Sequence, residues 1–568
     1  MHPSGACIAA VLKDPITALM GGEEKMAIVN VRSRFTSGYN QDALTTTTEG
    51  ERVLNFGKLT TTGDLADGIF ARADNLTIRN FARIETGGLG AAGILGTGND
   101  VSIENCGTVV TRGGFFDPDP NVEGDEAFSE GVVTIGDRFH IANFGTVRVE
   151  GESATGLSGV GADGTIINYG HVECTSFNSS LIASIGDNAT SINAGLISAG
   201  GSDNAAMFAR GADAAAVNLG RIFINGTVMV GIQGVLENTH ITNRGVIRVT
   251  GDESAGMGGF GNNQEISNFG LIETEGTLAT GMAARGGGPL QLPGLDSDVL
   301  NAGRITTEGD IAFGIAIGVG RFGFIAAGNG EITNRGIIET RGDGAAGIVL
   351  IGDGHHLTNS GRIKADGETF DSEVHGVFRA AGVLVSGDDV LLENTRSGVI
   401  ESGDAASAAV ELNVLEREGL PAEGMSSQLA NSGLVRGVNT AIVGGDGQET
   451  VINRGRIVGN VELSGGDDTF VFAKGSVLAG NLFLGEGADL VFVENGSGRT
   501  GVADFIAGDA SGDTIDVSAF FSDFGELQDA IRQNTRGDVV IRLDNNDTLV
   551  LAGVQVNVLN AADFIFGM

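Results

Sequence analysis

A short phrase built around asparagine returns along most of the chain, and it limits the possible folds more than any other feature. The phrase reads apolar, spacer, Asn, spacer, Gly, spacer, aliphatic, as between Val53 and Leu59. Many copies are 25 residues apart, among them those at Asn143, Asn168, Asn193, Asn218, Asn243 and Asn268. A fixed period of about 20–50 residues is typical of stacked repeats, in which each unit buries its apolar face against its neighbours.

The repeating unit has the pattern of a coil made of short strands. Apolar and Asn positions alternate with a period of two, so Ile141, Asn143 and Val147 share one face of a strand. Turn dipeptides such as Gly136-Asp137 separate the strands, and no window has the length and periodicity of a helix. We therefore predict an all-β fold, a parallel β-helix with coils of about 25 residues. A right-handed turn is expected because parallel β crossovers favour it.

The recurring asparagines are predicted to face the interior of this β-helix. A buried amide is costly alone, but a column of identical amides can pair each donor with an acceptor in the next coil. We therefore interpret the six asparagines named above as a structural ladder and not as a chemical site.

The charge of the chain limits its partners. The formal net charge is −38, which argues against nucleic acid and anionic membranes, because phosphate binding needs clusters of Lys and Arg. A divalent cation is the natural partner of so acidic a surface. No apolar stretch approaches the length of a membrane span.

Three segments are expected from the repeat. Residues 1–45 lack it and are predicted to be an N-terminal cap or leader, 46–458 form the β-helix, and 459–568 form a different C-terminal domain. Insertions interrupt the coils, and they are the places where function is most readily added to a repeat scaffold. They lie at 115–126, 286–294, 321–324, 368–373 and 416–427.

One group of side chains is a weak catalytic candidate. His355 and His356 stand next to each other and close to Asp353. However, His356, like His140 and His240, lies three residues before a repeat asparagine, where other coils carry Thr, Ser or Glu. A generic outward polar position is the competing interpretation, and no catalytic residue is assigned.

The pattern changes after Asn453 to a repeat of 21 residues that contains Gly-x-Asp-x-apolar, at Gly466 to Asp468 and at Gly487 to Asp489. With the segments from Asp547 to Val554 and from Asp563 to Phe566, this region resembles the C-terminal region of RTX-type proteins. Those are bacterial proteins exported by type I secretion systems, which read an uncleaved C-terminal signal. The resemblance implies a β-roll-like domain, export by that machinery, and bound Ca²⁺.

The same resemblance implies the calcium ligands. Glycines allow tight turns whose carbonyls face the ion, and aspartates supply carboxylates, which suits a hard cation. The candidate positions are Gly466, Asp468, Gly485, Gly487, Asp489, Asp513 and Asp516. Ser464 stands where the pattern has a glycine, so a metal-free coil leading into the secretion segment is the alternative.

The repeat region also resembles, more loosely, the β-helical passengers of bacterial surface proteins and adhesins. We therefore expect a secreted, non-enzymatic β-solenoid that acts at the cell surface or in the extracellular matrix, by binding surface polysaccharide or by self-association. A polysaccharide lyase, epimerase or hydrolase on the same scaffold is the alternative. A surface- or ice-binding solenoid is a third possibility, suggested by the run Thr45–Thr48.

Overall fold

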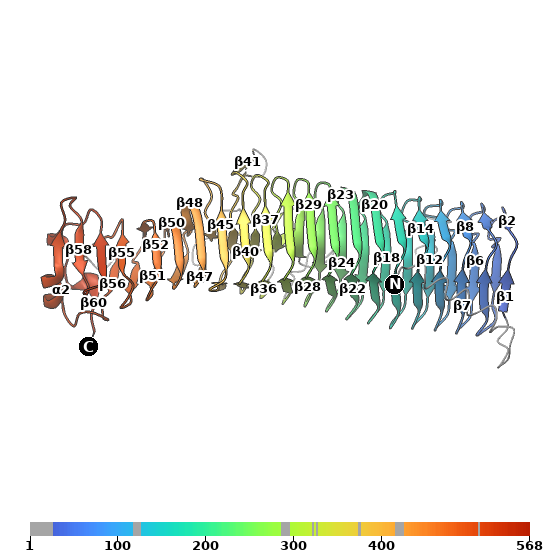
Figure 1. The fold of residues 1–568 in the computed structure, drawn as a ribbon, viewed down its shortest axis with the longest axis horizontal. Coiled ribbons are helices and arrows are strands. Elements are labelled where there is room, and N and C mark those ends of the chain that lie inside the picture. The colour runs from blue at the N-terminus through green and yellow to red at the C-terminus, as the bar shows by residue number, and fades with distance from the viewer. Residues whose placement is uncertain are drawn as a thin grey trace. The chain divides into compact units, whose positions relative to one another are not determined.

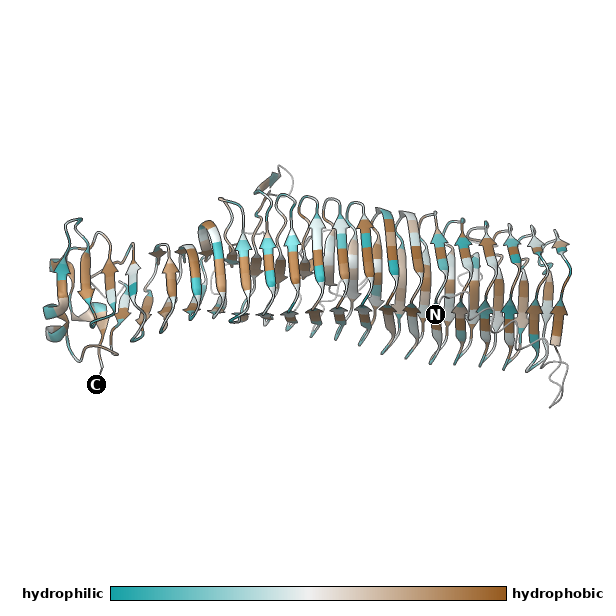
Figure 2. Cartoon of the chain, viewed as in Figure 1, coloured by the Kyte–Doolittle hydropathy of each residue, from teal (hydrophilic) through white to brown (hydrophobic). Residues whose placement is uncertain are grey.

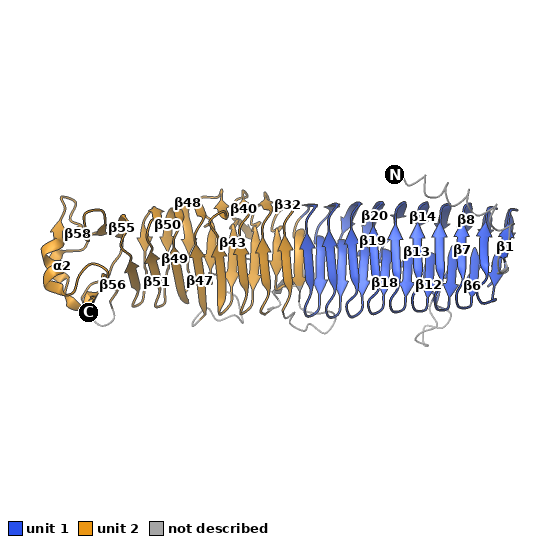
Figure 3. Cartoon of the chain, turned by 60° about the horizontal axis from the view of Figure 1, so that its bottom comes forward, with its two compact units in different colours: residues 1–276, 287–290 blue, residues 277–286, 291–568 orange. Residues whose placement is uncertain are grey.

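The structure is a computed structural model that describes residues 27–117, 127–285, 296–320, 323–324, 328–372, 376–414, 425–508 and 512–567. The chain divides into two compact units, residues 1–276 with 287–290 (unit 1) and residues 277–286 with 291–568 (unit 2), coloured separately in Figure 3. Each unit is a stack of coils in which short strands pair in parallel with strands of the adjacent coils (Figure 1). The predicted all-β parallel β-helix is therefore confirmed.

Unit 1 contains three ranks of strands. The first rank ends at the repeat asparagines and comprises β1 (Ala27–Asn30), β4 (Arg52–Asn55), β7 (Thr77–Asn80), β10 (Ser102–Asn105), β13 (His140–Asn143), β16 (Thr165–Asn168), β19 (Thr190–Asn193), β22 (Ala215–Asn218), β25 (His240–Asn243) and β28 (Glu265–Asn268). The second comprises β2 (Arg34–Thr36), β5 (Leu59–Thr61), β8 (Arg83–Thr86), β11 (Thr108–Thr111), β14 (Thr146–Val149), β17 (His171–Cys174), β20 (Leu196–Ser202), β23 (Arg221–Thr227), β26 (Val246–Thr250) and β29 (Leu271–Glu275). The third comprises β3 (Leu44–Thr46), β6 (Ile69–Arg72), β9 (Ile94–Thr97), β12 (Glu130–Ile135), β15 (Thr155–Val160), β18 (Ser180–Ile185), β21 (Ala205–Arg210), β24 (Val230–Val235) and β27 (Ala255–Phe260).

Unit 2 continues the same plan with more interruptions. Its first rank comprises β31 (Asp298–Asn301), β36 (Glu331–Asn334), β39 (His356–Asn359), β44 (Val390–Asn394), β47 (Ser426–Asn431), β49 (Gln448–Asn453), β51 (Thr469–Phe472), β54 (Leu490–Val493), β56 (Thr514–Asp516) and β60 (Phe564–Ile565). The other ranks comprise β30 (Thr280–Arg285), β32 (Arg304–Glu308), β33 (Ile315–Ile317), β37 (Ile337–Thr340), β38 (Ile348–Ile351), β40 (Arg362–Ala365), β43 (Val383–Ser386), β45 (Val399–Ser402), β46 (Val410–Leu412), β48 (Leu434–Val443), β50 (Arg456–Glu462), β52 (Val477–Ala479), β53 (Leu482–Phe483), β55 (Arg499–Val502) and β59 (Thr548–Leu551).

The remaining elements of unit 2 depart from the coil. Two antiparallel hairpins leave it, β34 (Val319–Gly320) with β35 (Gly323–Phe324) and β41 (Phe370–Ser372) with β42 (Gly376–Phe378). Near the C-terminus lie helix α2 (Phe524–Ala530), strands β57 (Ile531–Gln533) and β58 (Val539–Arg542), and the short 3-10 helices η1 (Val556–Val558) and η2 (Ala561–Asp563).

Alternation within each short strand explains the narrow core. In β16, for example, Ile166 and Asn168 are buried whereas Thr165 and Ile167 are partly exposed. The strands carry most of the hydrophobic colour in Figure 2. Because each coil contributes only a few inward residues, its core is completed by the coils on either side.

The repeat asparagines are buried and form a continuous chain of side-chain hydrogen bonds within each unit. In unit 1, Nδ2 of Asn143 donates to Oδ1 of Asn168 at 2.8 Å, and Asn168 donates to Asn193 at 2.8 Å. Oδ1 of Asn168 also accepts the backbone N–H of Gly170 at 3.2 Å. The same bonds link Asn301 through Asn453 in unit 2. Each amide thus recovers in the core the bonds that it loses in water.

The first described coil lies earlier than the repeat suggests. Strand β1 pairs in parallel with β4, and Asn30 donates to Oδ1 of Asn55 at 2.8 Å. The phrase is not recognisable there because Arg32 occupies the place of Gly57 in the next coil. The structure therefore extends the coils into residues 27–45, which the sequence pattern assigned to a cap or leader.

The amide chain ends at Asn453, where the sequence repeat changes. Strand register places Phe472 and then Val493 on top of Asn453, so an apolar column replaces the amides. Ser464 has a φ of +74°, and Gly485, at the corresponding place in the next coil, has a φ of +101°. A Cβ on Gly485 would lie 1.9 Å from the carbonyl oxygen of Ser464, which explains the glycine there.

Candidate functional site

The histidine candidates do not share one face of the coil. The His355 side chain is fully buried, where Nδ1 accepts the backbone N–H of Gly330 at 3.0 Å. His356 points outward, and its Nε2 lies 3.7 Å from a carboxylate oxygen of Glu393. Asp353 accepts the backbone N–H of Asp388 at 2.9 Å. Each of these side chains therefore has a local structural role, and the two imidazoles face opposite sides of a strand.

Many aspartates in the turns hold the next coil. Oδ1 of Asp137 accepts the N–H of Ala162 at 2.9 Å, and Asp187 accepts that of Ala212 at 3.0 Å. In unit 2, Asp343 accepts the N–H of Glu368 at 2.9 Å. A charged acceptor strengthens such a bond. Part of the acidic composition therefore connects successive turns.

Three of the predicted calcium positions form a buried rank in unit 2. Oδ1 of Asp468, Asp489 and Asp513 accepts the N–H of Glu449, Asp468 and Asp489, at 2.7, 2.8 and 3.3 Å respectively. We call Glu449, Asp468, Asp489 and Asp513 the carboxylate rank. Asp516 lies on the other face of β56, where it accepts the N–H of Ser518 at 2.9 Å. Gly466, Gly485 and Gly487 lie in the turns that precede the rank, all with positive φ.

Burial changes the titration of the carboxylate rank. It raises the pKa of Asp468 to about 9 and that of Glu449 to about 7, and each carboxyl raises the pKa of its neighbours further. Burial likewise raises the pKa of Asp489 and Asp513. Such shifts arise because a carboxylate away from water loses hydration that one amide donor does not replace.

The rank has oxygens to offer a cation. Among the described residues, Oε2 of Glu449 and Oδ2 of Asp468 and Asp489 are buried with no hydrogen-bond partner. These are hard ligands of the kind that Ca²⁺ takes. However, no group of three or more His, Cys, Asp or Glu side chains suited to a metal is present in the described part of the chain. A bound cation would therefore use two carboxylates from adjacent coils and turn carbonyls.

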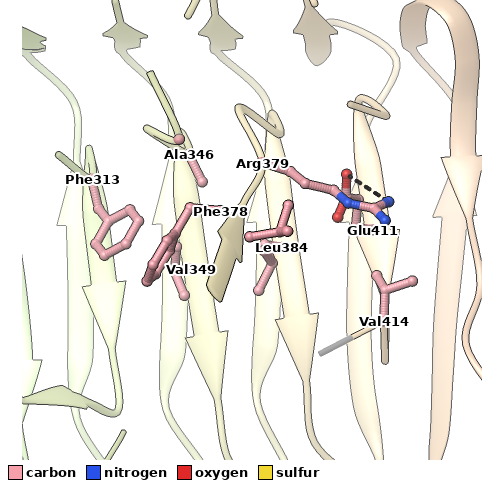
Figure 4. A pocket seen from close by; sticks show the side chains of 10 residues that line it. Phe313, Ala346, Val349, Phe378, Arg379, Leu384, Glu411 and Val414 are labelled. Atoms are coloured by element: carbon pink, nitrogen blue, oxygen red, sulfur yellow. Dashed lines mark ion pairs between the residues drawn. The ribbon is translucent and has the colours of Figure 1, made fainter. Parts of the chain in front are cut away.

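A cavity of about 480 Å³ lies elsewhere in unit 2, on the outer side of the third rank (Figure 4). Strand register stacks Ala316, Val349, Leu384 and Glu411 in one outward column across β33, β38, β43 and β46. All four are buried, although they face away from the solenoid core. Phe378 of hairpin strand β42 lies against Val349 in Figure 4 and helps to line the cavity.

An ion pair closes one end of this cavity. Nη1 of Arg379 lies 3.9 Å from Oε1 of Glu411, and the same oxygen accepts the N–H of Ala408 at 3.2 Å. The Glu411 side chain is 2% exposed whereas that of Arg379 is 40% exposed. Burial raises the pKa of Glu411, and the positive charge of Arg379 opposes the rise.

Sequence reasoning did not identify the residues of the cavity. Val349 and Leu384 look like ordinary strand residues, and Glu411 is one of many acids. The available signal was the loss of alternation in β38, where four consecutive apolar residues are all buried. The hairpin comes from the predicted insertion at 368–373; residues 118–126, 286–295, 373–375 and 415–424, which include most of the other insertions, lie outside the described residues.

Comparison with known proteins gives one match. The family described as BigA third pectate lyase-like domain matches residues 257–398, which include strands β28 to β44 and much of the cavity. The comparisons with curated proteins and with solved structures found no match. In the described residues, no helix has the length and apolar character needed to cross a membrane.

Proposed function

We propose that this protein is a secreted, non-enzymatic β-helix that acts at the cell surface or in the extracellular matrix. The observation that carries the proposal is the use of polar side chains for stacking: repeat asparagines and turn aspartates bind the next coil. Such a scaffold presents a long, regular surface for contact with a polysaccharide or with another copy of the chain.

The proposed route of secretion is type I export through the C-terminal region. Its support is the resemblance of residues 459–568 to RTX-type proteins. The test compares the full chain with a variant that ends at residue 458, in a bacterium that carries a type I exporter. We expect the full chain in the medium and the truncated chain inside the cell. A full-length variant lacking the coil 194–218 is the control, and equal export of the truncated chain would refute the route.

The binding function is tested separately on the purified full chain. We expect it to co-sediment with surface polysaccharide from the producing cells, or to form concentration-dependent oligomers in analytical ultracentrifugation. A chain that remains monomeric and binds no polysaccharide, with or without calcium, would contradict the proposal.

Calcium is proposed to stabilise the carboxylate rank. Asp468 and Asp489 would supply oxygens, and neutralising adjacent buried carboxylates would lower their mutual repulsion. We expect millimolar CaCl₂, but not MgCl₂, to raise the melting temperature, and Asp489→Asn to reduce this gain. Asp516→Asn is the matched control, because Asp516 lies on the other face of its strand. An equal calcium response in both variants would exclude the rank as the site.

A polysaccharide lyase is the second candidate, favoured by the match to a pectate lyase-like domain at residues 257–398. Catalysis on a sugar polymer needs an acid or base and a cation that converge on one face. Asp353, His355 and His356 do not meet this requirement. The lyase is tested by incubation with polygalacturonate, where falling viscosity and rising ultraviolet absorbance would establish it.

A further inference from the structure

The outward column of unit 2 has an unusual composition for the outside of a coil. At the equivalent place in unit 1, Phe208 and Gln233 are partly exposed. In unit 2, by contrast, Val349 and Leu384 are buried beneath the hairpin β41–β42. The hairpin is packed closely, since a Cβ on Gly344 would lie 2.7 Å from Cβ of Phe378. The cavity therefore lies between two packed layers.

The cavity has the size and lining of a small-molecule site. Its volume of about 480 Å³ falls within the range of about 300–1,000 Å³ that is usual for such pockets. Phe313, Val349 and Leu384 supply apolar walls, and Arg379 and Glu411 lie together at the far end in Figure 4. A ligand that fits this lining has an apolar body and one polar end.

The charges at that end select the polar group. The separation of 3.9 Å between Arg379 and Glu411 exceeds a hydrogen bond, so the guanidinium keeps donors that it can turn toward a ligand. A carboxylate matches the planar fork of Arg in a bidentate pair. An ammonium group would be repelled by Arg379, and the Glu411 oxygen nearest to it already accepts the N–H of Ala408.

We propose that this cavity binds a small amphiphilic carboxylate, with its apolar body along Phe313, Val349 and Leu384 and its carboxylate on Arg379. A protonated Glu411 can donate a hydrogen bond to the same carboxylate, and the burial that raises its pKa favours that form. The site is independent of the proposed surface function, because it lies beneath a hairpin and not on the regular face of the coils.

The test measures binding of decanoate, decanol and decylammonium to the full chain by isothermal titration calorimetry, each below its micelle concentration. We expect saturable binding of decanoate at one site, at least about tenfold tighter than that of decanol, and no binding of decylammonium. Decylammonium binding as tightly as decanoate, or no saturable binding of decanoate, would overturn the proposal.

Variants assign the binding to this cavity. Arg379→Gln should weaken decanoate about tenfold or more and leave decanol unchanged, whereas Val349→Trp should fill the cavity and abolish both. Arg362→Gln is the matched control, since Arg362 pairs with Glu401 on the surface of the same unit. Melting curves confirm that each variant is folded, and a folded Arg379→Gln variant with unchanged decanoate affinity would refute the role of Arg379.

Discussion

A repeat asparagine uses its side-chain amide in two directions at once. Asn193 accepts from Asn168 and donates to Asn218, both at 2.8 Å. Replacing it with alanine removes these bonds and leaves a buried donor and a buried acceptor without partners. Unsatisfied buried groups cost about 1–3 kcal/mol each.

We therefore predict that Asn193→Ala lowers the free energy of unfolding of unit 1 by about 2–4 kcal/mol. Chemical denaturation of the full chain, followed by circular dichroism, measures the change. Asn225→Ala is the control, because Asn225 is exposed on β23. A loss no larger than that of the control would contradict the structural role of the amide chain.

Asp67 predicts how the stability of unit 1 depends on pH. Burial, then the nearby acids Asp42 and Glu130, raise its pKa to about 8, against the opposing N–H of Ala92. Between pH 4 and pH 8 the folded chain therefore holds a proton that the unfolded chain has lost. This contribution is fully present below about pH 4 and is lost as the pH rises toward 8.

The measurement compares stability at pH 5 and pH 8. We expect Asp67→Asn to reduce the loss of unfolding free energy between these values by more than about 1 kcal/mol. Asp64→Asn removes a carboxylate from the same turn and serves as the control. If Asp67→Asn keeps the full pH dependence of the wild type, then Asp67 is not the group that titrates.

At the scale of the coil, the glycine after each asparagine permits close stacking. A Cβ on Gly145 would lie 1.9 Å from the carbonyl oxygen of Gly107 in the preceding coil. The backbone would have to move apart, and the hydrogen bonds of the turn would lengthen.

We predict that Gly145→Ala destabilises unit 1 by about 2 kcal/mol or more. Gly200→Ala is the control, because a Cβ there meets nothing closer than 3.8 Å. Thermal melting of both variants measures the difference, and equal melting temperatures would show that the coils have room to spare at this turn.

The coil itself could be predicted from the sequence because its cause is local and repeated. An inward position with a period of two, a turn with Gly and Asp, and a 25-residue spacing describe one coil, and stacking follows from its unburied face. The first coil was missed since Arg32 replaces the usual glycine, although Asn30 still joins the amide chain.

The cavity could not be predicted in the same way. Its walls come from Phe313, Leu384 and Phe378, which belong to different coils and to a hairpin without a repeat. The pairing of Arg379 with Glu411 likewise depends on where that hairpin folds back. Interactions of this kind have no sequence period, so they become visible only when the coils are stacked.

For the whole molecule, charge predicts the response to salt. Asp and Glu number 72 against 34 Lys and Arg, so repulsion among unbalanced acids opposes the compact state. Salt screens this repulsion over roughly 10 Å at 0.1 M ionic strength. We predict that the melting temperature rises between 10 mM and 200 mM NaCl, and a fall would mean that surface ion pairs such as Arg248–Glu273 dominate.

The central claim is that chain segments 25 residues apart are adjacent, parallel and in register. Register pairs Arg248 with Glu273 and Phe223 with Arg248, so Phe223 and Glu273 are two coils apart. Adjacent strands are about 4.8 Å apart, within the reach of a disulfide, whereas two coils span roughly 10 Å.

Cysteine pairs in the full chain test this arrangement most directly. Under mild oxidation, with bonds identified by non-reducing peptide mapping, we predict that Arg248→Cys with Glu273→Cys forms a disulfide and that Phe223→Cys with Glu273→Cys does not. Cross-linking of the second pair but not of the first would contradict the stacked-coil structure.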